Sequence, residues 1–590
     1  MKKGLLAELL RCQEFINGSK FESDEKIHFY LLQCFSEIEV MKRLKPEEYV
    51  GDEARILCDI ADSIAKFHIE LAYDKKERGE SFDEDIAIYK VFFIRLRKQV
   101  DLFPKEENIF GSFLKTLEAG CAWRIEDDDK DVFLWMWDSI KRDYLDWIDT
   151  NRYMDHRNRE VLMRICVEFA AEPSIASILA YKGVPAFLYE MRKETISNAP
   201  YKVCRVFFKL LNAIITTLPK LVVTIMFLVK SHLKSFADAL LIKDISSPKN
   251  IQGWVDFIDS CVSFFTSEEF FSIDEKYIQY DDIVENFEID ERIDISNFPD
   301  HYEIPHETLE GGARSICIYN LSIVVIEECL EPMIGIVDRF YRREDVARNI
   351  LTVINKLLGV DGIEPIILDI MVSYCREWLE RFMDGATVQV VFSIFQQFAF
   401  PESNAERMCI FCDDVLQKLH ILPSLSIVEI SPAIAFFGNL VEMRFQTVLE
   451  KIWKPKVMAS WCSKILDWDI AAEVERRRRI ELDEGYEADL EELADTLQSD
   501  FLMCVRNFSS TLCVELLNKI KIYQEECQMT LKGKEEEDAA DYKDLRANLK
   551  YMKTIEKDIY SMVEQLHKKY GHKSEFTTEC FEEFIQMEAP

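Results

Sequence analysis

Residue types that could perform covalent or metal chemistry are present in this chain, but they lack the patterns that such chemistry needs. Cys409 and Cys412 have the CxxC spacing of zinc ligands and redox dithiols, but no second pair accompanies them. His301 and His306 are close in sequence but lack cysteine partners. Motifs of the GxxxxGK[ST], GxGxxG, GxSxG and HExxH kinds are absent. The sequence therefore predicts no enzyme, no cofactor and no metal site.

A polar side chain recurs in one local setting, apolar-x-polar-apolar, along much of the chain. In Ile354-Asn355-Lys356-Leu357 the polar residue is Lys356; from 356 to 397 is 41 residues, and from 397 to 439 is 42. Side chains of this kind can hydrogen-bond the main chain of an extended peptide, while neighbouring pockets select its side chains. The candidate partner-binding residues are Glu168, Asn212, Asn320, Gln397, Asn439 and Asn507.

Residues 161–191 carry a second pattern that must position these side chains. An apolar helix face is followed by a Pro break, a second apolar stretch, the turn Lys182-Gly183-Val184-Pro185 and another apolar helix. The turn recurs as Gly362-Ile363-Glu364-Pro365. With the steps of about 40 residues, this layout resembles diverged armadillo repeats, and HEAT repeats remain an alternative. The resemblance implies an all-α fold, a right-handed α-solenoid whose concave face carries the six polar residues.

Composition agrees with a large helical protein. The chain has 590 residues, too many for one compact core, and only 18 Gly and 16 Pro, which favours helix over strand. The formal net charge of −35 argues against direct nucleic-acid binding and suits a basic partner, or simply keeps a large surface soluble. The 17 cysteines, scattered on apolar faces, and the lack of a signal peptide predict a cytoplasmic or nuclear protein.

One apolar stretch, Val206–Val229, has the length of a membrane span. Lys209, Pro219 and Lys220 interrupt it, and its apolar runs are about half the roughly 20 residues that a span needs. We therefore predict two packed helices joined at Pro219 and no membrane span.

The spacing also predicts a domain plan. From 212 to 320 is 108 residues, or two periods plus 24, and a diverged repeat around Trp254–Phe265 fills one of the two. From 439 to 507 is 68 residues, or one period of 42 plus 26. Insertions in such stacks fall in loops. The predicted parts are N-terminal repeats or a cap (1–150), armadillo-like repeats (151–266), an acidic insertion (267–312), further repeats (313–472), a charged insertion (473–500), a last repeat (501–531), and a charged linker with a C-terminal helix (532–590).

The outer parts have their own signals. Amphipathic spacing predicts N-terminal helices at 5–10, 27–44, 54–71, 86–103 and 132–148. Residues 268–310 hold 15 Asp/Glu against two basic residues, with apolar residues interleaved. Arg476–Arg479 precede nine acids, which indicates either a nuclear localisation signal or local charge neutralisation. The helix around 545–566 is expected to cap the last repeat or to bind a partner helix.

These features favour a protein-binding scaffold or adaptor for a basic or extended segment. The alternatives are a GTPase regulator, since some acidic armadillo proteins are exchange factors or chaperones for GTPases, and a nuclear-transport factor. Import adaptors carry Trp four residues before each polar position. The residues found there are Arg164, Phe208, Ile316, Ser393, Ala435 and Met503. None is Trp, which argues against that mode of peptide binding.

Overall fold

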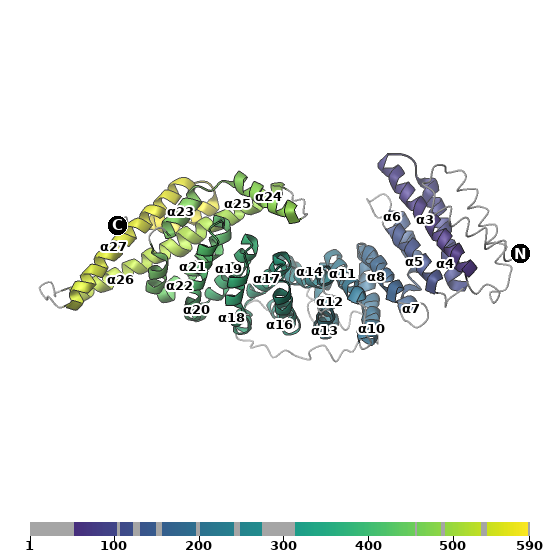
Figure 1. The fold of residues 1–590 in the computed structure, drawn as a ribbon, viewed down its shortest axis with the longest axis horizontal. Helices are drawn as coiled ribbons and strands as arrows, with labels where there is room; N and C mark the ends of the chain where they lie inside the picture. The colour runs from purple at the N-terminus through teal and green to yellow at the C-terminus, as the bar shows by residue number, and fades with distance from the viewer. Residues whose placement is uncertain are drawn as a thin grey trace. The chain divides into compact units, whose positions relative to one another are not determined.

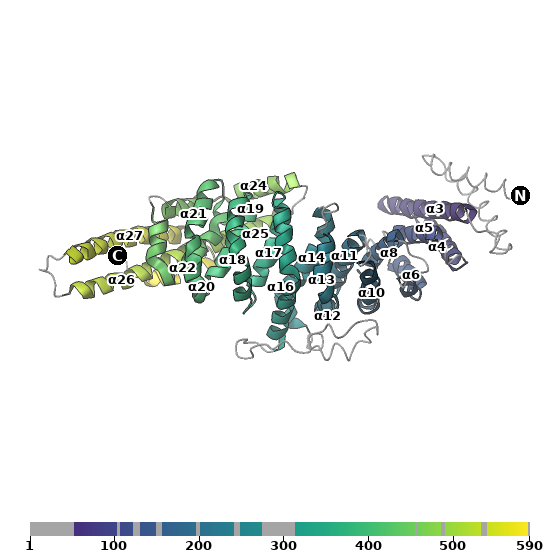
Figure 2. The same cartoon turned by 60° about the horizontal axis from the view of Figure 1, so that its bottom comes forward.

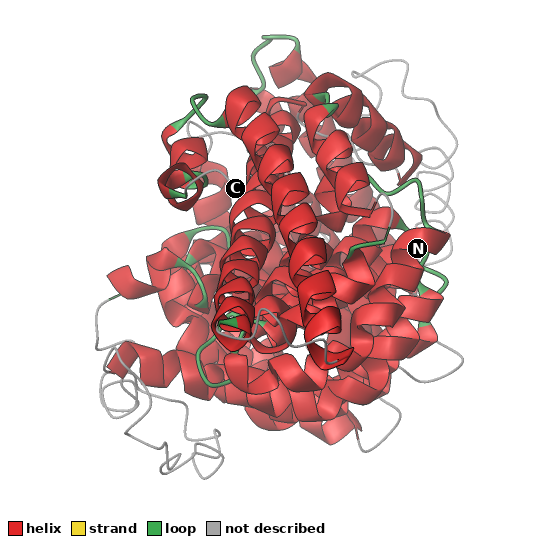
Figure 3. Cartoon of the chain, turned by 90° about the vertical axis from the view of Figure 1, so that its left-hand side faces the viewer, coloured by secondary structure: helices red, strands yellow, loops and turns green. Residues whose placement is uncertain are grey.

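Every element in the described part of the chain is a helix. The computed structural model describes residues 52–102, 107–121, 130–148, 156–195, 201–240, 248–273, 313–454, 457–484, 490–532 and 540–587. No strand occurs in these ranges, which confirms the predicted all-α class (Figure 3). The chain divides into two compact units. Among the described residues, unit 1 comprises 52–273, 313–317 and 327–332, and unit 2 comprises 318–326 and 333–587.

Unit 1 is built from short and medium helices, purple to teal in Figure 1. Its elements are α3 (Asp52–Glu77), α4 (Asp83–Leu102), α5 (Glu107–Cys121), α6 (Lys130–Ile140), α7 (Tyr144–Ile148), α8 (His156–Phe169), α9 (Pro173–Ile178), η3 (Leu179–Gly183), α10 (Val184–Thr195), α11 (Tyr201–Thr217), η4 (Pro219–Leu221), α12 (Val222–Val229), η5 (Lys230–His232), α13 (Leu233–Leu240), α14 (Pro248–Phe265) and η6 (Glu268–Ser272). The helices α3, α5, α8, α11 and α14 pack each against the next. The repeat expected around Trp254–Phe265 is thus a helix, α14.

The predicted helix 132–148 is broken into α6 and α7. Arg97 of α4 pairs with Asp143 in the intervening turn, Nη2 to Oδ2 2.5 Å. The break brings the rings of Trp137 and Tyr144 to 5.2 Å and lets Trp147 pack edge-on against Phe113 at 5.6 Å. Apolar spacing alone could not place this turn, because both halves present aromatic residues to the same core.

The segment 161–191 forms the predicted order of helices, but not the predicted glycine turn. α8 ends, α9 begins at Pro173, and η3 leads directly into α10. The segment η3 is π-helical, with the amide of Val184 donating to the carbonyl of Leu179. Gly183 therefore stays helical. By contrast, Gly362 has φ +81°, a left-handed conformation that favours glycine, and it forms the turn that its sequence predicts.

The apolar stretch 206–229 is divided as predicted. α11 ends at Thr217, and η4 starts at Pro219 and passes into α12, which packs back on α11. None of the described helices has the combination of length and apolarity that crossing a bilayer requires.

A buried carboxylate joins α3 and α4 in unit 1. Asp85 accepts from Lys75 Nζ at 2.7 Å and lies 2.9 Å from His68 Nδ1. Burial alone would raise the pKa of Asp85, but the hydrogen bonds from Lys75 and His68 outweigh it and hold that pKa below its ordinary value.

The lowered pKa of Asp85 predicts how the free energy of unfolding depends on pH. The stabilisation is present above the ordinary aspartate pKa and is lost as the pH falls through the lowered pKa of the folded state, since the carboxylate must then be protonated. We expect Asp85→Asn to cost about 2 kcal/mol at neutral pH and to make the unfolding free energy less sensitive to acid. Denaturant unfolding at about pH 7 and about pH 3 measures both effects. The exposed Asp83→Asn is the control, and an acid dependence in Asp85→Asn as steep as in the wild type would contradict the assignment.

Unit 2 contains the longer helices. Its elements are α16 (Ala313–Arg339), which contributes residues to both units, α17 (Glu344–Leu358), α18 (Glu364–Arg381), α19 (Gly385–Ala399), α20 (Glu402–Met408), η9 (Cys409–Phe411), α21 (Cys412–Ile421), α22 (Ile427–Ile452), α23 (Val457–Leu466), α24 (Ile470–Glu484), α25 (Leu490–Arg506), η10 (Asn507–Val514), α26 (Glu515–Leu531), α27 (Ala540–Tyr570), α28 (Glu575–Glu579) and α29 (Glu582–Gln586). α26 and α27 run side by side (Figure 2).

Contacts in unit 2 repeat at a nearly constant sequence separation. α17 packs on α19, and α19 on α22, and these helices start at 344, 385 and 427, steps of 41 and 42. Ion pairs on neighbouring helices recur 38 residues apart. They are Asp369–Arg407, Glu406–Arg444 and Asp413–Lys451. The period that the sequence predicts between 356 and 439 is therefore a period of packed helices.

The charged insertion predicted at 473–500 is not a loop in its described residues. Residues 473–484 lie in α24 and 490–500 in α25, because Leu497 and Phe501 give α25 a buried face. The C-terminal helix starts at Ala540, and its Ile555, Ile559 and Leu566 are buried. Of the acidic insertion, 267–273 include the 3-10 helix η6, and 274–312 lie outside the described residues. The helices predicted at 5–10 and 27–44 also lie outside them.

Cysteine serves as a small core residue, as predicted. Of the 15 cysteines among the described residues, 14 are buried and Cys409 is half-buried. Burial raises the pKa of the Cys58 and Cys375 thiols to about 12. These thiols are therefore protonated and unreactive in the folded protein.

Candidate functional site

Polar side chains occupy matching positions on three helices of unit 2, α17, α19 and α22, that pack each against the next. Lys356 lies near the end of α17, Gln397 near the end of α19 and Asn439 in the middle of α22, and all three are half-buried. Asn439 Nδ2 donates to the carbonyl of Gln396 at 3.2 Å, which fixes the register between α19 and α22. Beneath it, the rings of Phe395 and Phe436 pack edge-to-face at 5.8 Å. We call Lys356, Gln397 and Asn439 the polar row.

The neighbourhood of the polar row has hydrogen-bonding capacity left over. The Oδ1 atoms of Asn320 and Asn355 are buried and accept no hydrogen bond from the described residues. A buried amide oxygen without a donor is costly, so a donor supplied from outside would be stabilising. The sequence pattern selected Lys356 on α17 and missed its neighbour Asn355. Asn355 could have been found from the sequence, because it directly precedes Lys356.

Asn507 does not join the polar row. Its side chain is only 6% exposed, and its Nδ2 donates to Ser431 Oγ at 3.0 Å. Ser431 lies two turns before Asn439 on α22. The residue beside Gly438 is Thr511, whose backbone oxygen lies 2.8 Å from where a Cβ on Gly438 would be. Thr511, one helical turn after Asn507, therefore lies beside Gly438, while Asn507 bonds Ser431 and holds η10 against α22.

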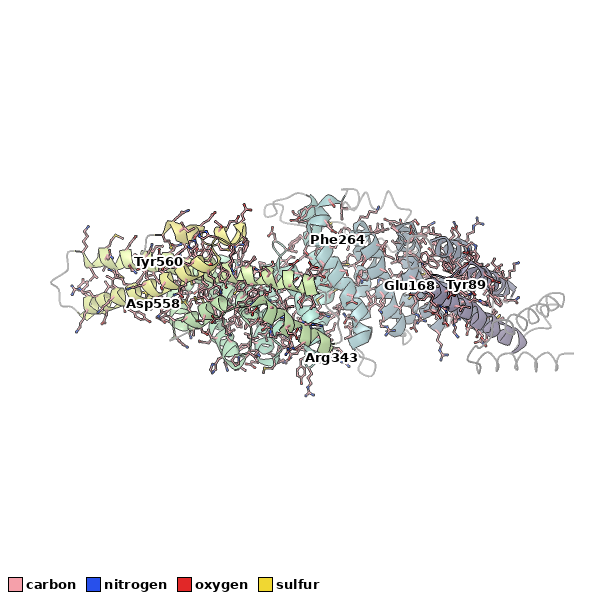
Figure 4. The ribbon with its side chains drawn as sticks, turned by 90° about the horizontal axis from the view of Figure 1, so that it is seen from above. Tyr89, Glu168, Phe264, Arg343, Asp558 and Tyr560 are labelled. Carbon is pink, nitrogen blue, oxygen red and sulfur yellow. The ribbon has the colours of Figure 1, made fainter. Side chains whose placement is uncertain are left out.

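The two candidates in unit 1 are placed differently. Glu168 is exposed near the end of α8, where Figure 4 labels it. Asn212 is half-buried on α11, and its Oδ1 is buried without a hydrogen bond from the described residues. Of the six candidates, the structure thus shows direct alignment only for Gln397 and Asn439.

A second polar cluster in unit 2 lies at the start of α22. Ser426 caps this helix, and the Ser426 amide donates in turn to Glu429 Oε2 at 2.7 Å. Glu429 Oε1 accepts from Arg476 at 2.9 Å and lies 3.3 Å from Arg477 Nη2, and the Glu429 side chain is 1% exposed. Gly385 makes room, because a Cβ there would lie 2.5 Å from the same oxygen.

The arginines of this cluster belong to the run 476–479. Arg476 also forms a fork with Glu473, at 3.0 and 2.5 Å, and Arg479 pairs with Glu475 at 3.0 Å. Burial would raise the pKa of Glu473, but Arg476 and Arg477 hold it below its ordinary value. The arginines are thus neutralised by Glu473, Glu475 and Glu429, and not by the nine acids that follow the run in sequence. Glu429 was missed, although Ser426-x-x-Glu429 before an apolar run is a capping-box signal.

The CxxC pair lies at the start of α21. Burial raises the pKa of Cys412 to about 12, and it also raises the pKa of Cys409, which Arg444 partly opposes. No group of three or more His, Cys, Asp or Glu side chains with metal-binding geometry occurs among the residues that the structure describes.

Comparison with known proteins adds no relative: no family model matches the chain, and no curated protein matches it.

Proposed function

We propose that this protein is a non-enzymatic binding scaffold of armadillo-like helical repeats, arranged as a right-handed solenoid, that holds an extended partner segment along the polar row. The observation that carries the proposal is the packing of α17, α19 and α22 at steps of 41 and 42 residues, with a polar side chain at matching positions. Stacked repeats present such positions on one continuous surface.

The spacing suits an extended chain. Packed helices lie about 8–10 Å apart, and an extended peptide advances roughly 3.3 Å per residue. Each helix step therefore corresponds to about three peptide residues, and a segment of roughly seven residues would run from Lys356 to Asn439. Gln397 is half-buried and follows Gln396, whose carbonyl accepts from Asn439, so its amide is placed to bond a peptide main chain.

Charge favours a basic partner. The whole chain carries a net charge of −35, so Lys- and Arg-bearing segments are attracted over a distance of about one Debye length, near 10 Å at 0.1 M salt. Acidic side chains such as Asp369, Glu406 and Asp413 are exposed in unit 2 and keep part of their field in solvent although each is paired. Such pairs are weak, so a basic segment can compete for them.

The test is a displayed library of random peptides selected on the full-length protein. We expect extended, Lys- or Arg-bearing sequences, and we expect Lys356→Ala/Gln397→Ala/Asn439→Ala to weaken their binding about tenfold or more. Loss of the Asn439 hydrogen bond to Gln396 should lower the free energy of unfolding by only about 1 kcal/mol, so the variant stays folded. The control is Gln417→Ala/His420→Ala, which removes exposed polar side chains from α21. Equal peptide binding by the wild type and the triple variant would contradict the proposal.

A further inference from the structure

The helix α24 is attached to unit 2 in an unusual way. Among its residues 470–479, only Glu473 is buried, and Ile470 and Val474 are half-buried. Arg476 and Arg477 bond it to α22 and α19: both arginines contact Glu429, and Arg477 Nη2 also donates to Gln389 Oε1 at 3.3 Å. Figures 1 and 2 show α24 beside α25 and near α19. Ionic and polar bonds thus join residues 470–479 of α24 to α22 and α19, while α24 also packs on α25.

The receiving side of this contact is complete without α24. Glu429 is fixed by the capping box with Ser426, and Gly385 leaves space against its carboxylate. Gln389 presents an amide oxygen from the next helix. A carboxylate and an amide oxygen, both held by rigid helices, accept the forked N–H groups of a guanidinium. Lysine, a point donor without the fork, satisfies them less well.

An empty receiving side would leave the Glu429 carboxylate without its guanidinium partners, with only the Ser426 amide as a donor and the charge of Lys464 nearby. Ionic attachment also weakens with salt, whereas apolar burial does not. The contact therefore has two properties of an exchangeable site: a ligand that can leave and a receptor that needs another guanidinium when it does.

We propose that Glu429 and Gln389 form a binding site for paired arginines of a partner protein segment, and that α24 occupies this site until such a segment replaces it. The site lies at the starts of α19 and α22, whereas the polar row lies farther along both helices. The inference therefore goes beyond the proposed function and does not rest on the polar row.

The test uses the full-length protein and a labelled synthetic peptide with the α24 sequence, residues 470–484. The variant Arg476→Ala/Arg477→Ala vacates the site and leaves Glu429 in place. We expect it to bind the peptide about tenfold or more tightly than the wild type does, by fluorescence anisotropy at about 0.1 M salt. Adding Glu429→Gln should abolish the gain. The matched control is Arg478→Ala/Arg479→Ala, which removes arginines that pair with Glu475 instead of Glu429 and should bind like the wild type.

Two further measurements cover a vacated variant that fails to fold. Arg476→Lys/Arg477→Lys keeps both charges but loses the forks, so its gain in peptide binding should be intermediate. In the wild type, hydrogen exchange of α24 amides should speed up between about 0.1 and 0.5 M salt while α22 amides stay protected. The inference is overturned if a folded vacated variant binds no better than the wild type, if Glu429→Gln leaves the gain intact, or if α24 and α22 exchange alike at both salt concentrations. The polar-row triple variant should bind the peptide as the wild type does, which separates this site from the proposed function.

Discussion

Replacing Glu429 with alanine is expected to lower the free energy of unfolding of unit 2 by about 3–5 kcal/mol. The change removes one of the two carboxylates that Arg476 and Arg477 share and leaves them Glu473, and Arg477 is only 14% exposed. It also removes the returning bond to the Ser426 amide and a negative charge from the first turn of α22. Breaking one side of a buried ion pair costs more than the pair contributes, because the remaining charge stays buried.

Chemical denaturation of the full-length protein, followed by the fluorescence of unit 2 tryptophans such as Trp378 and Trp461, measures this loss. Glu450→Ala removes an exposed carboxylate from the same helix and should change stability by less than about 0.5 kcal/mol. Similar losses in the two variants would show that Glu429 is not buried against the arginines. Glu429→Gln should fall between them, because glutamine keeps the shape and one acceptor but not the charge.

Gly438→Ala is expected to cost about 2–3 kcal/mol, the second largest effect of a single change. A Cβ at this position would lie 2.8 Å from both the backbone oxygen and the Cγ2 of Thr511. The obstacle includes backbone, so it cannot turn aside as a flexible side chain can. α22 and η10 would have to separate along a contact that also includes Asn507 and Ser431.

Gly335→Ala in α16 provides a matched control with the opposite sign. A Cβ on Gly335 meets nothing within 4 Å, and helix propensity alone should stabilise this variant by about 0.5–1 kcal/mol. Thermal unfolding of Gly438→Ala and Gly335→Ala under identical conditions measures the two changes in stability. A Gly438→Ala variant as stable as the wild type would mean that α22 and η10 are farther apart than the structure places them.

Local spacing was sufficient for the helices themselves. The predicted helix 54–71 is part of α3, and 86–103 nearly coincides with α4, because apolar residues at steps of three and four define a buried face that neighbouring helices then cover. The division at Pro219 was predictable for a similar reason, since proline ends a helical hydrogen-bond ladder at a definite place.

The errors of register fall where the backbone leaves the α-helix. Gly183 belongs to η3 and Asn507 to η10, and both segments are π-helical. A π turn closes over five residues instead of four, so each one shifts the following side chains around the helix axis. A pattern with the α-helical period therefore fails for side chains beyond the start of such a segment, such as Thr511, which takes the place beside Gly438. No residue type marks a π turn, and the sequence offered no way to foresee the shift.

Long-range pairs were equally out of reach. Glu429 and Arg476 are 47 residues apart, and only the return of α24 onto α22 brings them together. Local charge pairing along α24 was predictable because its partners lie three or four residues apart. The cytoplasmic or nuclear location and the protein partner remain predictions.

The buried cysteines can report local unfolding at many places in the molecule. Cys58 in α3, Cys166 in α8, Cys375 in α18 and Cys504 in α25 are each enclosed in a different part of the helical core, and similar thiols occupy many of the other helices. An alkylating reagent can reach one of these sulfurs only while the surrounding helices are locally unfolded. The rate at which each cysteine is modified therefore reports how often its own region opens. Because these cysteines are native, mass spectrometry of the unmutated protein can give the order in which its helices unfold.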